Sequence, residues 1–330
     1  MEKNTRNRKL NKKLNLLITA IPFIPVVKKF ENLIKKRGIN YKILKSTQYV
    51  SEKKFLKIIE KFDAILSGDD QITKKVIDKA KNLKVISKWG TGIDSIDYVY
   101  AKKKGIKVFN TPGAFTYGVA TMAISMILAF YRQLITNHND IKKNKWKKYS
   151  GETLLNKKIG VIGVGNIGKK IIEMIQGFET INYVNDINKI NKNFLLKYKL
   201  KSKTKKFIFN NCDIIIIATD LNKTSIKLIN KKTINQFKNN PLIVNIGRGG
   251  SIDNQALLNS LKRKKIKGAC LDVFENEPLS KNNLLKKYNN CILTSHNAFN
   301  TKDEVEFVNK NTLNNIFRGL NLNAEVIKKI

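Results

Sequence analysis

The chain has 330 residues and carries 64 lysines and arginines against 25 aspartates and glutamates, which gives a formal charge of +39. Its hydrophobic content of 42% is ordinary for a globular protein, and its length is enough for about two domains. A charge this high is typical of proteins that bind nucleic acid or anionic membranes. The basic residues, however, are mostly lysines spread through every segment, without arginine clusters or interleaved aromatic residues, so the sequence argues against a nucleic-acid partner.

The cysteines and the apolar runs indicate a reducing, membrane-free environment. Cys212, Cys270 and Cys291 are odd in number and lack Cys-x-x-Cys spacing, so we expect small buried thiols rather than disulfides. Residues 1–12 form a basic tail, and the apolar stretch after it is broken by polar residues and prolines, so it is interpreted as a strand rather than a signal peptide. The run from Val119 is shorter than the about 20 residues of a membrane span. The sequence therefore predicts a cytoplasmic protein with no membrane partner.

Short apolar runs alternate with amphipathic helical patterns along the chain, which is typical of parallel sheets flanked by helices. In the first series the expected strands are 14–20, 41–45, 63–67, 83–87 and 106–110, and the expected helices are 26–38, 52–62, 73–82 and 95–105. A long helix is then expected from Tyr117 to about Ile135, and the polar, basic segment 137–150 follows it as a projecting arm. In the second series the expected strands are 157–163, 181–186, 212–220, 242–247, 267–274 and 291–297.

A glycine fingerprint, "VIGVGNIG", stands at the start of the second series. It follows a strand that ends at Ile162 and precedes a helical run, so the backbone can approach a pyrophosphate while the N–H groups of the helix start face that anion. Asp186 ends the next strand, where a carboxylate can accept both ribose hydroxyls of a dinucleotide. A plain turn without a ligand is the alternative. The predicted cofactor-binding residues here are Gly163, Gly165, Asn166, Ile167, Gly168 and Asp186.

Five segments resemble hallmark segments of the NAD-dependent D-isomer-specific 2-hydroxyacid dehydrogenases. Three lie in the second series: "VNIGRGGSID" from Val244, "GACLDVFENEP" from Gly268 and "LTSHNAFNT" from Leu293. The segments "KWGTGIDSID" from Lys88 and "VFNTPGAFTYGVA" from Val108 are similar to substrate-domain loops of that family. Within the family the chain most resembles the D-3-phosphoglycerate dehydrogenases of the short form, without a C-terminal regulatory domain. The resemblance implies NAD as the cofactor and a small 2-hydroxy or 2-oxo acid as the substrate.

The same resemblance implies the domain organisation. A Rossmann dinucleotide-binding domain, expected over 113–297, is inserted into a discontinuous flavodoxin-like substrate domain, expected over 13–112 and 298–330. The helix from Tyr117 and the arm after it then pair subunits into a homodimer or homotetramer. No metal ion is expected.

Reduction of a 2-oxo acid needs a cation at the carboxylate and carbonyl, an acid that protonates the new alkoxide, and a group that holds this acid in place. By resemblance, Arg248 is the cation, His296 is the acid and Glu277 is its partner. A hydrogen bond from the ring N–H of His296 to the Glu277 carboxylate would fix the imidazole and favour its charged form. For Arg248 the alternative is a structural ion pair. His138, the second histidine of the chain, lies in the polar arm and is interpreted as an exposed residue.

Three further site assignments rest on the resemblance. Asp272 matches the family aspartate that faces the nicotinamide amide, with a capping role as the alternative. Gly90, Thr91 and Gly92 match the loop whose backbone N–H groups hold the substrate carboxylate, with a simple turn as the alternative. Lys88 falls where related phosphoglycerate enzymes can place a phosphate-binding arginine.

Four positions depart from the phosphoglycerate members. Ser67 stands where those enzymes often have a second arginine. Phe115 and Thr121 stand where those enzymes often have polar or acidic residues, and Asp220 stands where the family often has proline. The expected reaction is the oxidation of 3-phosphoglycerate to 3-phosphohydroxypyruvate in serine biosynthesis. The alternatives are a reductase of the glyoxylate or hydroxypyruvate type and a non-enzymatic, NAD-sensing regulator of the corepressor type.

Overall fold

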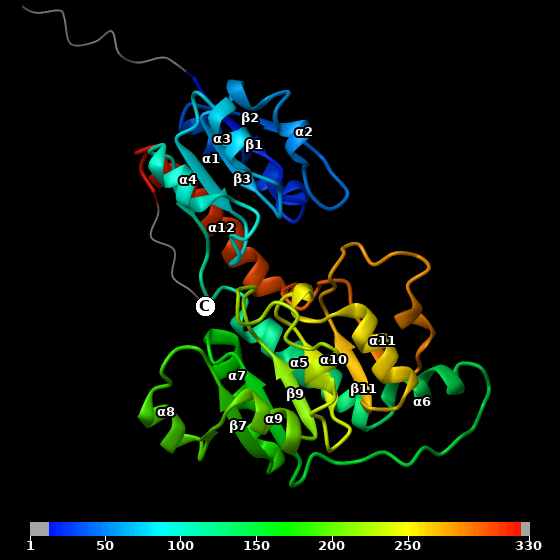
Figure 1. Cartoon of the computed structure of the whole chain (residues 1–330). Helices are drawn as coiled ribbons and strands as arrows, with labels where there is room; N and C mark the ends of the chain where they lie inside the picture. The colour runs from blue at the N-terminus through cyan, green and yellow to red at the C-terminus, as the bar shows by residue number, and fades with distance from the viewer. Residues whose placement is uncertain (1–12, 325–330) are drawn as a thin grey trace, which may run out of the picture. The chain divides into compact units, whose positions relative to one another are not determined.

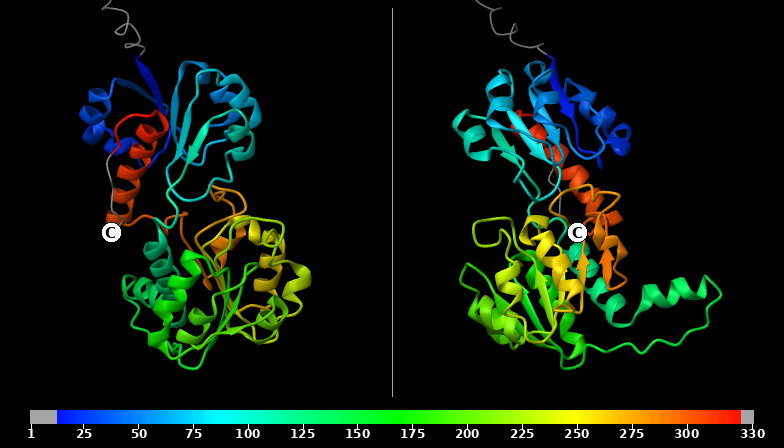
Figure 2. Two further views of the ribbon diagram at one scale, coloured as in Figure 1. Left: turned by 90° about the vertical axis from the view of Figure 1, so that its left-hand side faces the viewer. Right: turned by 45° about the vertical axis from the view of Figure 1, so that its right-hand side comes forward.

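The structure is a computed structural model that describes residues 13–324, so the predicted basic tail lies outside it. The described residues divide into two compact units. The first combines the chain up to Ala114 with the chain from Lys302 onward, and the second is Phe115–Thr301. Each unit is a parallel sheet flanked by helices, which confirms the predicted α/β fold class (Figures 1 and 2).

The first unit contains a five-stranded sheet in the order β2-β1-β3-β4-β5, the doubly wound order of flavodoxin-like folds. Its central strands are aliphatic and buried on both faces, as parallel strands between two helix layers require. The strands are β1 (Leu14–Ile18), β2 (Ile39–Ile43), β3 (Ala64–Ser67), β4 (Val85–Lys88) and β5 (Lys107–Phe109). The helices are α1 (Val27–Lys36), α2 (Glu52–Phe55), α3 (Lys74–Lys79), α4 (Tyr98–Lys103) and α12 (Lys302–Gly319), with 3-10 turns at Ile24–Val26 and Ile59–Lys61.

The segment predicted as one helix over 52–62 forms two short pieces. Between them the chain winds more tightly, and the N–H of Ile58 donates to the carbonyl of Phe55, three residues back, at 3.0 Å. No glycine or proline marks this break. The buried residues Phe55, Ile59 and Phe62 keep a helix-like spacing, which is why their pattern predicts a continuous helix.

Helix α12 joins the first unit from the far end of the chain. It packs against β3, β4 and β5. The hydroxyl of Ser87 donates to the carbonyl of Thr312 at 2.9 Å. A Cβ on Gly319 would lie 2.2 Å from the Val85 side chain, so the helix lies directly on the strand. This unit is therefore built from two separate stretches of chain.

The second unit contains a seven-stranded sheet in the order β12-β11-β10-β9-β6-β7-β8. The chain begins this sheet at β6 and reverses its direction of winding between β6 and β9, where doubly wound sheets bind their ligands. The strands are β6 (Lys158–Ile162), β7 (Ile181–Asn185), β8 (Lys201–Ser202), β9 (Ile214–Ile217), β10 (Leu242–Asn245), β11 (Gly268–Leu271) and β12 (Cys291–Leu293). The helices are α5 (Thr116–Tyr131), α6 (Leu134–Ile141), α7 (Asn166–Ile175), α8 (Lys192–Lys197), α9 (Lys205–Asn211), α10 (Lys231–Ile234) and α11 (Asn254–Lys262).

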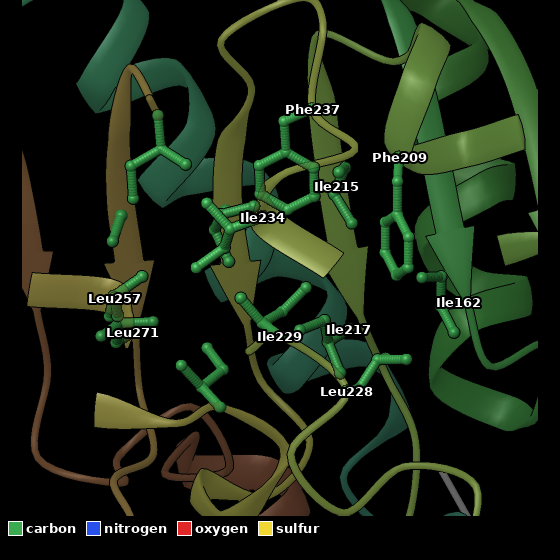
Figure 3. Close-up of a cluster of buried hydrophobic side chains, with 14 of the residues drawn as sticks. Ile162, Phe209, Ile215, Ile217, Leu228, Ile229, Ile234, Phe237, Leu257 and Leu271 are labelled. Atoms are coloured by element: carbon green, nitrogen blue, oxygen red, sulfur yellow. The ribbon is translucent and has the colours of Figure 1, made fainter. Parts of the chain in front are cut away.

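One face of this sheet buries an aliphatic core, shown in Figure 3. Ile215 and Ile217 of β9 are fully buried there, and the rings of Phe209 and Phe237 lie with their centroids 5.7 Å apart. Burial of each such side chain contributes about 1.5–3 kcal/mol to stability. The core therefore fixes the central strands, whose carboxyl ends carry the candidate site.

The long apolar helix ends earlier than predicted. Helix α5 ends at Tyr131, and Gln133 adopts a φ of 53°, so the chain turns into α6 at 64° to α5. Within residues 13–324 no single helix is long and apolar enough to span a membrane, and α5 with α6 reaches that length only as this bent pair. The segment after α6 projects from the rest of the unit (Figure 2), and its Trp146 is 87% exposed.

The cysteines are free thiols, of which Cys212 and Cys270 are buried and Cys291 is half-buried. Burial raises the pKa of Cys212 and of Cys291 to about 12. Burial also raises the pKa of Cys270. The thiols therefore stay protonated near neutral pH and are poor nucleophiles, which agrees with the expectation that they pack as small apolar residues.

Candidate active site

The glycine fingerprint forms a tight turn between β6 and α7. Gly163 has a φ of +96°, and a Cβ there would lie 2.5 Å from the carbonyl oxygen of Ala218. A Cβ on Gly168 would lie 2.0 Å from the carbonyl oxygen of Gly163, so only glycine lets α7 start this close to the turn. A Cβ on Gly165 would meet no atom within 4 Å. This side of the loop is open, as the approach of a pyrophosphate requires.

Helix α7 supplies the donors for that anion. It begins at Asn166 with Gly165 as its N-cap residue. The first N–H groups of a helix have no acceptor within the helix, and the helix dipole makes this end positive. The N–H groups of Gly165, Asn166 and Ile167 therefore fit the negative charge of a dinucleotide pyrophosphate.

Asp186 follows β7 beside the fingerprint. One carboxylate oxygen accepts the N–H of Val164 at 2.6 Å, and the other accepts the N–H of Asn188 at 2.7 Å. Each oxygen keeps a second lone pair for a ribose hydroxyl. The residue therefore fits its predicted role, and it also holds the fingerprint turn against β7.

Thr219 is a candidate cofactor residue that sequence reasoning missed. It follows β9, the strand beside β6, and its buried hydroxyl has no hydrogen-bond partner within residues 13–324. A buried hydroxyl without a partner costs free energy, which a bound ligand can recover. Its methyl group lies 2.9 Å from the position of a Cβ on Gly163. The position of Thr219 at the end of the strand beside the fingerprint could have indicated this role. That position can be recognised only when the strand order is known.

The carboxyl ends of β10, β11 and β12 lie side by side and carry the predicted catalytic residues. Nδ1 of His296 lies 2.8 Å from one carboxylate oxygen of Glu277. The other oxygen of Glu277 accepts the N–H of Phe274 at 2.9 Å. The side chains are 35% and 21% exposed, so the pair is half-buried yet open to a ligand. The backbone thus fixes the carboxylate, and the carboxylate orients the imidazole.

Asp272 holds the turn that carries His296. It is 1% exposed, and one carboxylate oxygen accepts the hydroxyl of Thr294 at 2.6 Å and the N–H of Asn297 at 2.8 Å. The other oxygen accepts the N–H of Ala298 at 3.1 Å, and the Asp272 carbonyl accepts the N–H of His296 at 2.7 Å. These contacts correspond to the capping alternative considered for this residue, and its role at the nicotinamide stays a prediction.

Arg248 lies just beyond β10. Its Nη1 donates to the carbonyl of Gly247 at 2.9 Å, and its side chain is half-buried. A Cβ on Gly249 would lie 1.9 Å from the carbonyl oxygen of Phe274, so the Arg248 loop lies against the segment that holds Glu277. The second unit therefore brings the arginine, the carboxylate and the imidazole of the prediction to one edge of one sheet.

The predicted carboxylate loop follows β4 in the first unit. Gly90 has a φ of +113° and its carbonyl accepts the N–H of Thr111 at 2.8 Å. The carbonyl of Thr91 accepts the side-chain amide of Asn110 at 2.6 Å. Within residues 13–324 the N–H groups of Gly90, Thr91 and Gly92 donate to no protein acceptor. The loop thus ties its carbonyls down and leaves its donors for an anion.

Lys88, the predicted phosphate cation, is engaged within the first unit. Its Nζ lies 2.9 Å from a carboxylate oxygen of Asp69 and donates to the carbonyl of Trp89 at 3.0 Å. The Lys88 side chain is 6% exposed. Its charge is therefore already compensated where the prediction requires it to meet a phosphate.

Comparison with known proteins identifies the family. Residues 124–298 match the family model of the D-isomer specific 2-hydroxyacid dehydrogenase, NAD binding domain. The chain belongs to the D-isomer specific 2-hydroxyacid dehydrogenase family. A D-3-phosphoglycerate dehydrogenase from Archaeoglobus fulgidus is 30% identical over 282 residues, which make up 84% of this chain and 53% of that protein. A hydroxypyruvate reductase from Thermotoga maritima is 32% identical over 282 residues, which make up 84% of this chain and 91% of that protein.

A solved structure agrees with this assignment. The D-lactate dehydrogenase of Aquifex aeolicus, determined with NAD and lactic acid, is 25% identical and superposes with a TM-score of 0.81 over 91% of this chain and 93% of that one. The predicted family and the NAD cofactor are confirmed. The chain spans about half the length of the phosphoglycerate dehydrogenase that it matches, at 53%, and the names of its relatives divide between phosphorylated and unphosphorylated substrates.

Proposed function

We propose that this protein is an NAD-dependent D-2-hydroxyacid dehydrogenase that interconverts a small 2-oxo acid and its 2-hydroxy acid. The observation that carries the proposal is the contact of 2.8 Å between His296 and Glu277 in a unit with an NAD-binding fingerprint. A regulator that only senses NAD requires no acid–base pair, so this contact favours an enzyme over the corepressor-type alternative.

The roles of the residues follow from the chemistry of a carbonyl reduction. Bound NADH supplies the hydride that adds to C2 of the 2-oxo acid. In that direction His296 donates a proton to the developing alkoxide, and in oxidation it accepts the proton of the hydroxyl. Glu277 holds the ring at Nδ1, so the proton moves at Nε2. Arg248 stabilises the negative charge on the oxygen, and the N–H groups of Gly90 to Gly92 hold the carboxylate.

The proposed activity is compatible with two classes of substrate, phosphorylated and unphosphorylated acids. Sequence motifs and the Archaeoglobus relative support 3-phosphoglycerate and 3-phosphohydroxypyruvate, and with them a role in serine biosynthesis. The Thermotoga relative, named a hydroxypyruvate reductase, and a glyoxylate reductase from Thermofilum pendens, 34% identical over 256 residues, support unphosphorylated acids. The engaged state of Lys88 also favours the second class. In either case we propose a cytoplasmic enzyme with a substrate domain over 13–112 and 298–330 and a cofactor domain over 113–297.

The test is NADH oxidation by the purified protein with a panel of 2-oxo acids that includes glyoxylate, hydroxypyruvate and 3-phosphohydroxypyruvate. We expect turnover of at least one of them. If NADH binds and none is reduced, the proposed function is wrong. Salt-sensitive DNA binding measured on the same preparation would then favour the regulator.

A further inference from the structure

An ion pair between Lys88 and Asp69 lies at the carboxyl edge of the first unit's sheet. The sequence motifs of this unit do not account for it. β3 and β4 are neighbours, with Ser67 paired to Lys88 in register, and Asp69 lies two residues beyond β3. The Lys88 ammonium meets the Asp69 carboxylate at 2.9 Å and the Trp89 carbonyl at 3.0 Å. Lys88 is 6% exposed and Asp69 is 63% exposed. The lysine is therefore held inside, and the aspartate covers it from the solvent side.

A second carboxyl group lies next to this pair. Asp70 is 1% exposed and accepts hydrogen bonds from the Thr19 hydroxyl at 2.5 Å and from the N–H groups of Val50 and Gly68 at 2.7 and 2.8 Å. Burial raises the pKa of Asp70, while these hydrogen bonds and the charge of Lys88 act to lower it. Lys88 is thus paired with Asp69 and its charge also acts on Asp70, so it offers an incoming anion no uncompensated positive charge.

We propose that Asp69 is a specificity-determining residue, which keeps Lys88 in the ion pair and excludes substrates that carry a phosphate. The substrate class is then the unphosphorylated 2-oxo acids. This inference rests on the proposed function, because it takes the loop directly after Lys88, Gly90 to Gly92, as the carboxylate site. A phosphate dianion would have to displace the Asp69 carboxylate from the ammonium and would add like charge beside Asp70. The uncharged end of a small 2-oxo acid requires neither change.

The experiment compares kcat/KM for 3-phosphohydroxypyruvate and hydroxypyruvate in the full-length protein with NADH. The wild type is expected to favour hydroxypyruvate. Asp69→Asn should raise the ratio of phosphorylated to unphosphorylated kcat/KM about 10-fold, because the ammonium becomes available to the phosphate. Adding Lys88→Ala to Asp69→Asn should return the ratio to the wild-type value. Asp78→Asn is the matched control, since it removes an exposed carboxylate that pairs with Lys104 at 3.1 Å, and it should leave the ratio unchanged.

In the kinetic assay two results overturn the inference: a wild-type preference for 3-phosphohydroxypyruvate, and a ratio in folded Asp69→Asn equal to that of the wild type. A failure of the proposed function is distinguishable, because neither acid would then oxidise NADH in any variant. Direct binding remains informative in that case. Calorimetry of the NAD-loaded protein should give 3-phosphoglycerate a Kd about 10-fold lower in Asp69→Asn than in the wild type, and equal Kd values contradict the inference.

Discussion

At the scale of single residues, the backbone of His296 decides which substitution tests its role. Its φ of 51° lies in the left-handed region, which asparagine, aspartate and histidine tolerate better than most residues. His296→Asn should therefore keep the turn and NADH binding while kcat falls about 100-fold or more, because the proton donor is lost. Steady-state kinetics and a fluorescence titration with NADH measure the two effects. Wild-type turnover in this variant would exclude His296 as the acid.

Glu277 allows a milder test. Glu277→Gln keeps an oxygen for the N–H of Phe274 and removes the negative charge beside the imidazole. The protonated ring is then less stable, so it loses its proton at lower pH. Since reduction needs the protonated form, the upper pH limit of reduction should move down, with a smaller loss of kcat than in His296→Asn. The pH profile of kcat is the measurement, and an unchanged profile would remove Glu277 from the mechanism.

The residues of the site were predictable to different degrees. Arg248, Glu277 and His296 stand in short segments that resemble hallmark segments of the family, so the resemblance pointed to them, and the fold brings them to one sheet edge. The contact of Lys88 with Asp69 joins residues on two strands, and no pattern in the sequence indicates which lysine meets which aspartate. The contacts of Asp272 were not predictable either, because its carboxylate oxygens accept hydrogen bonds from a turn that forms only in the folded chain.

At the scale of elements, two glycines of the β6–α7–β7 segment have different roles: Gly168 allows close packing, and Gly165 leaves space for the cofactor. Gly168→Ala should lower Tm, because its Cβ would lie 2.0 Å from a carbonyl oxygen and overpacking of this kind costs about 1–3 kcal/mol. Gly165→Ala should leave Tm unchanged and weaken NADH binding, because its Cβ meets no protein atom and occupies the space of the pyrophosphate. Thermal unfolding without ligand and NADH titration test the pair. Equal effects of both variants on Tm would contradict this assignment.

The same β6–α7–β7 segment predicts a preference for NAD over NADP. The Asp186 carboxylate, tied to the N–H of Val164, would meet the 2′-phosphate of NADP as a like charge. The kcat/KM with NADH should exceed that with NADPH by about 10-fold or more, and Asp186→Asn should narrow the ratio. Lys189→Ala is a useful comparison, because this exposed lysine near Asp186 should reduce the preference for NADH over NADPH without abolishing it. Equal kcat/KM for the two cofactors in the wild type would place Asp186 away from the ribose.

The sequence predicted most of the helices and strands, but it did not predict where each begins and ends or the order of the strands in the sheets. The strands of both sheets lie in or overlap the predicted segments, because buried parallel strands are continuous aliphatic runs. The exception is β8, whose two residues are too few to form a pattern. The predicted helix from Tyr117 passed Gln133 because a left-handed backbone at glutamine has no sequence signature. Strand order depends on contacts between distant segments, so it required the structure.

At the scale of the whole molecule, helix α6 and the projecting segment after it predict self-association. Leu134 of α6 is 61% exposed, Ile141 is 46% exposed and Trp146 is 87% exposed, which is a large apolar surface for a soluble monomer to leave uncovered. We expect a homodimer or homotetramer by light scattering after gel filtration. Trp146→Ser with Leu134→Ser should shift the mass toward the monomer, and exposed Leu196→Ser is the control that should not. A wild-type monomer at micromolar concentration would contradict the prediction.

The two stretches of chain that build the first unit also set an order of events during translation. Helix α12 packs on β3, β4 and β5, yet its residues Lys302–Gly319 leave the ribosome only after the whole of Phe115–Thr301 has been made. The second unit contains all of its own strands and helices, so it can finish folding on the nascent chain. The sheet of the first unit is synthesised before the second unit but is covered only when α12 follows, so of these two units the one that begins first is completed last.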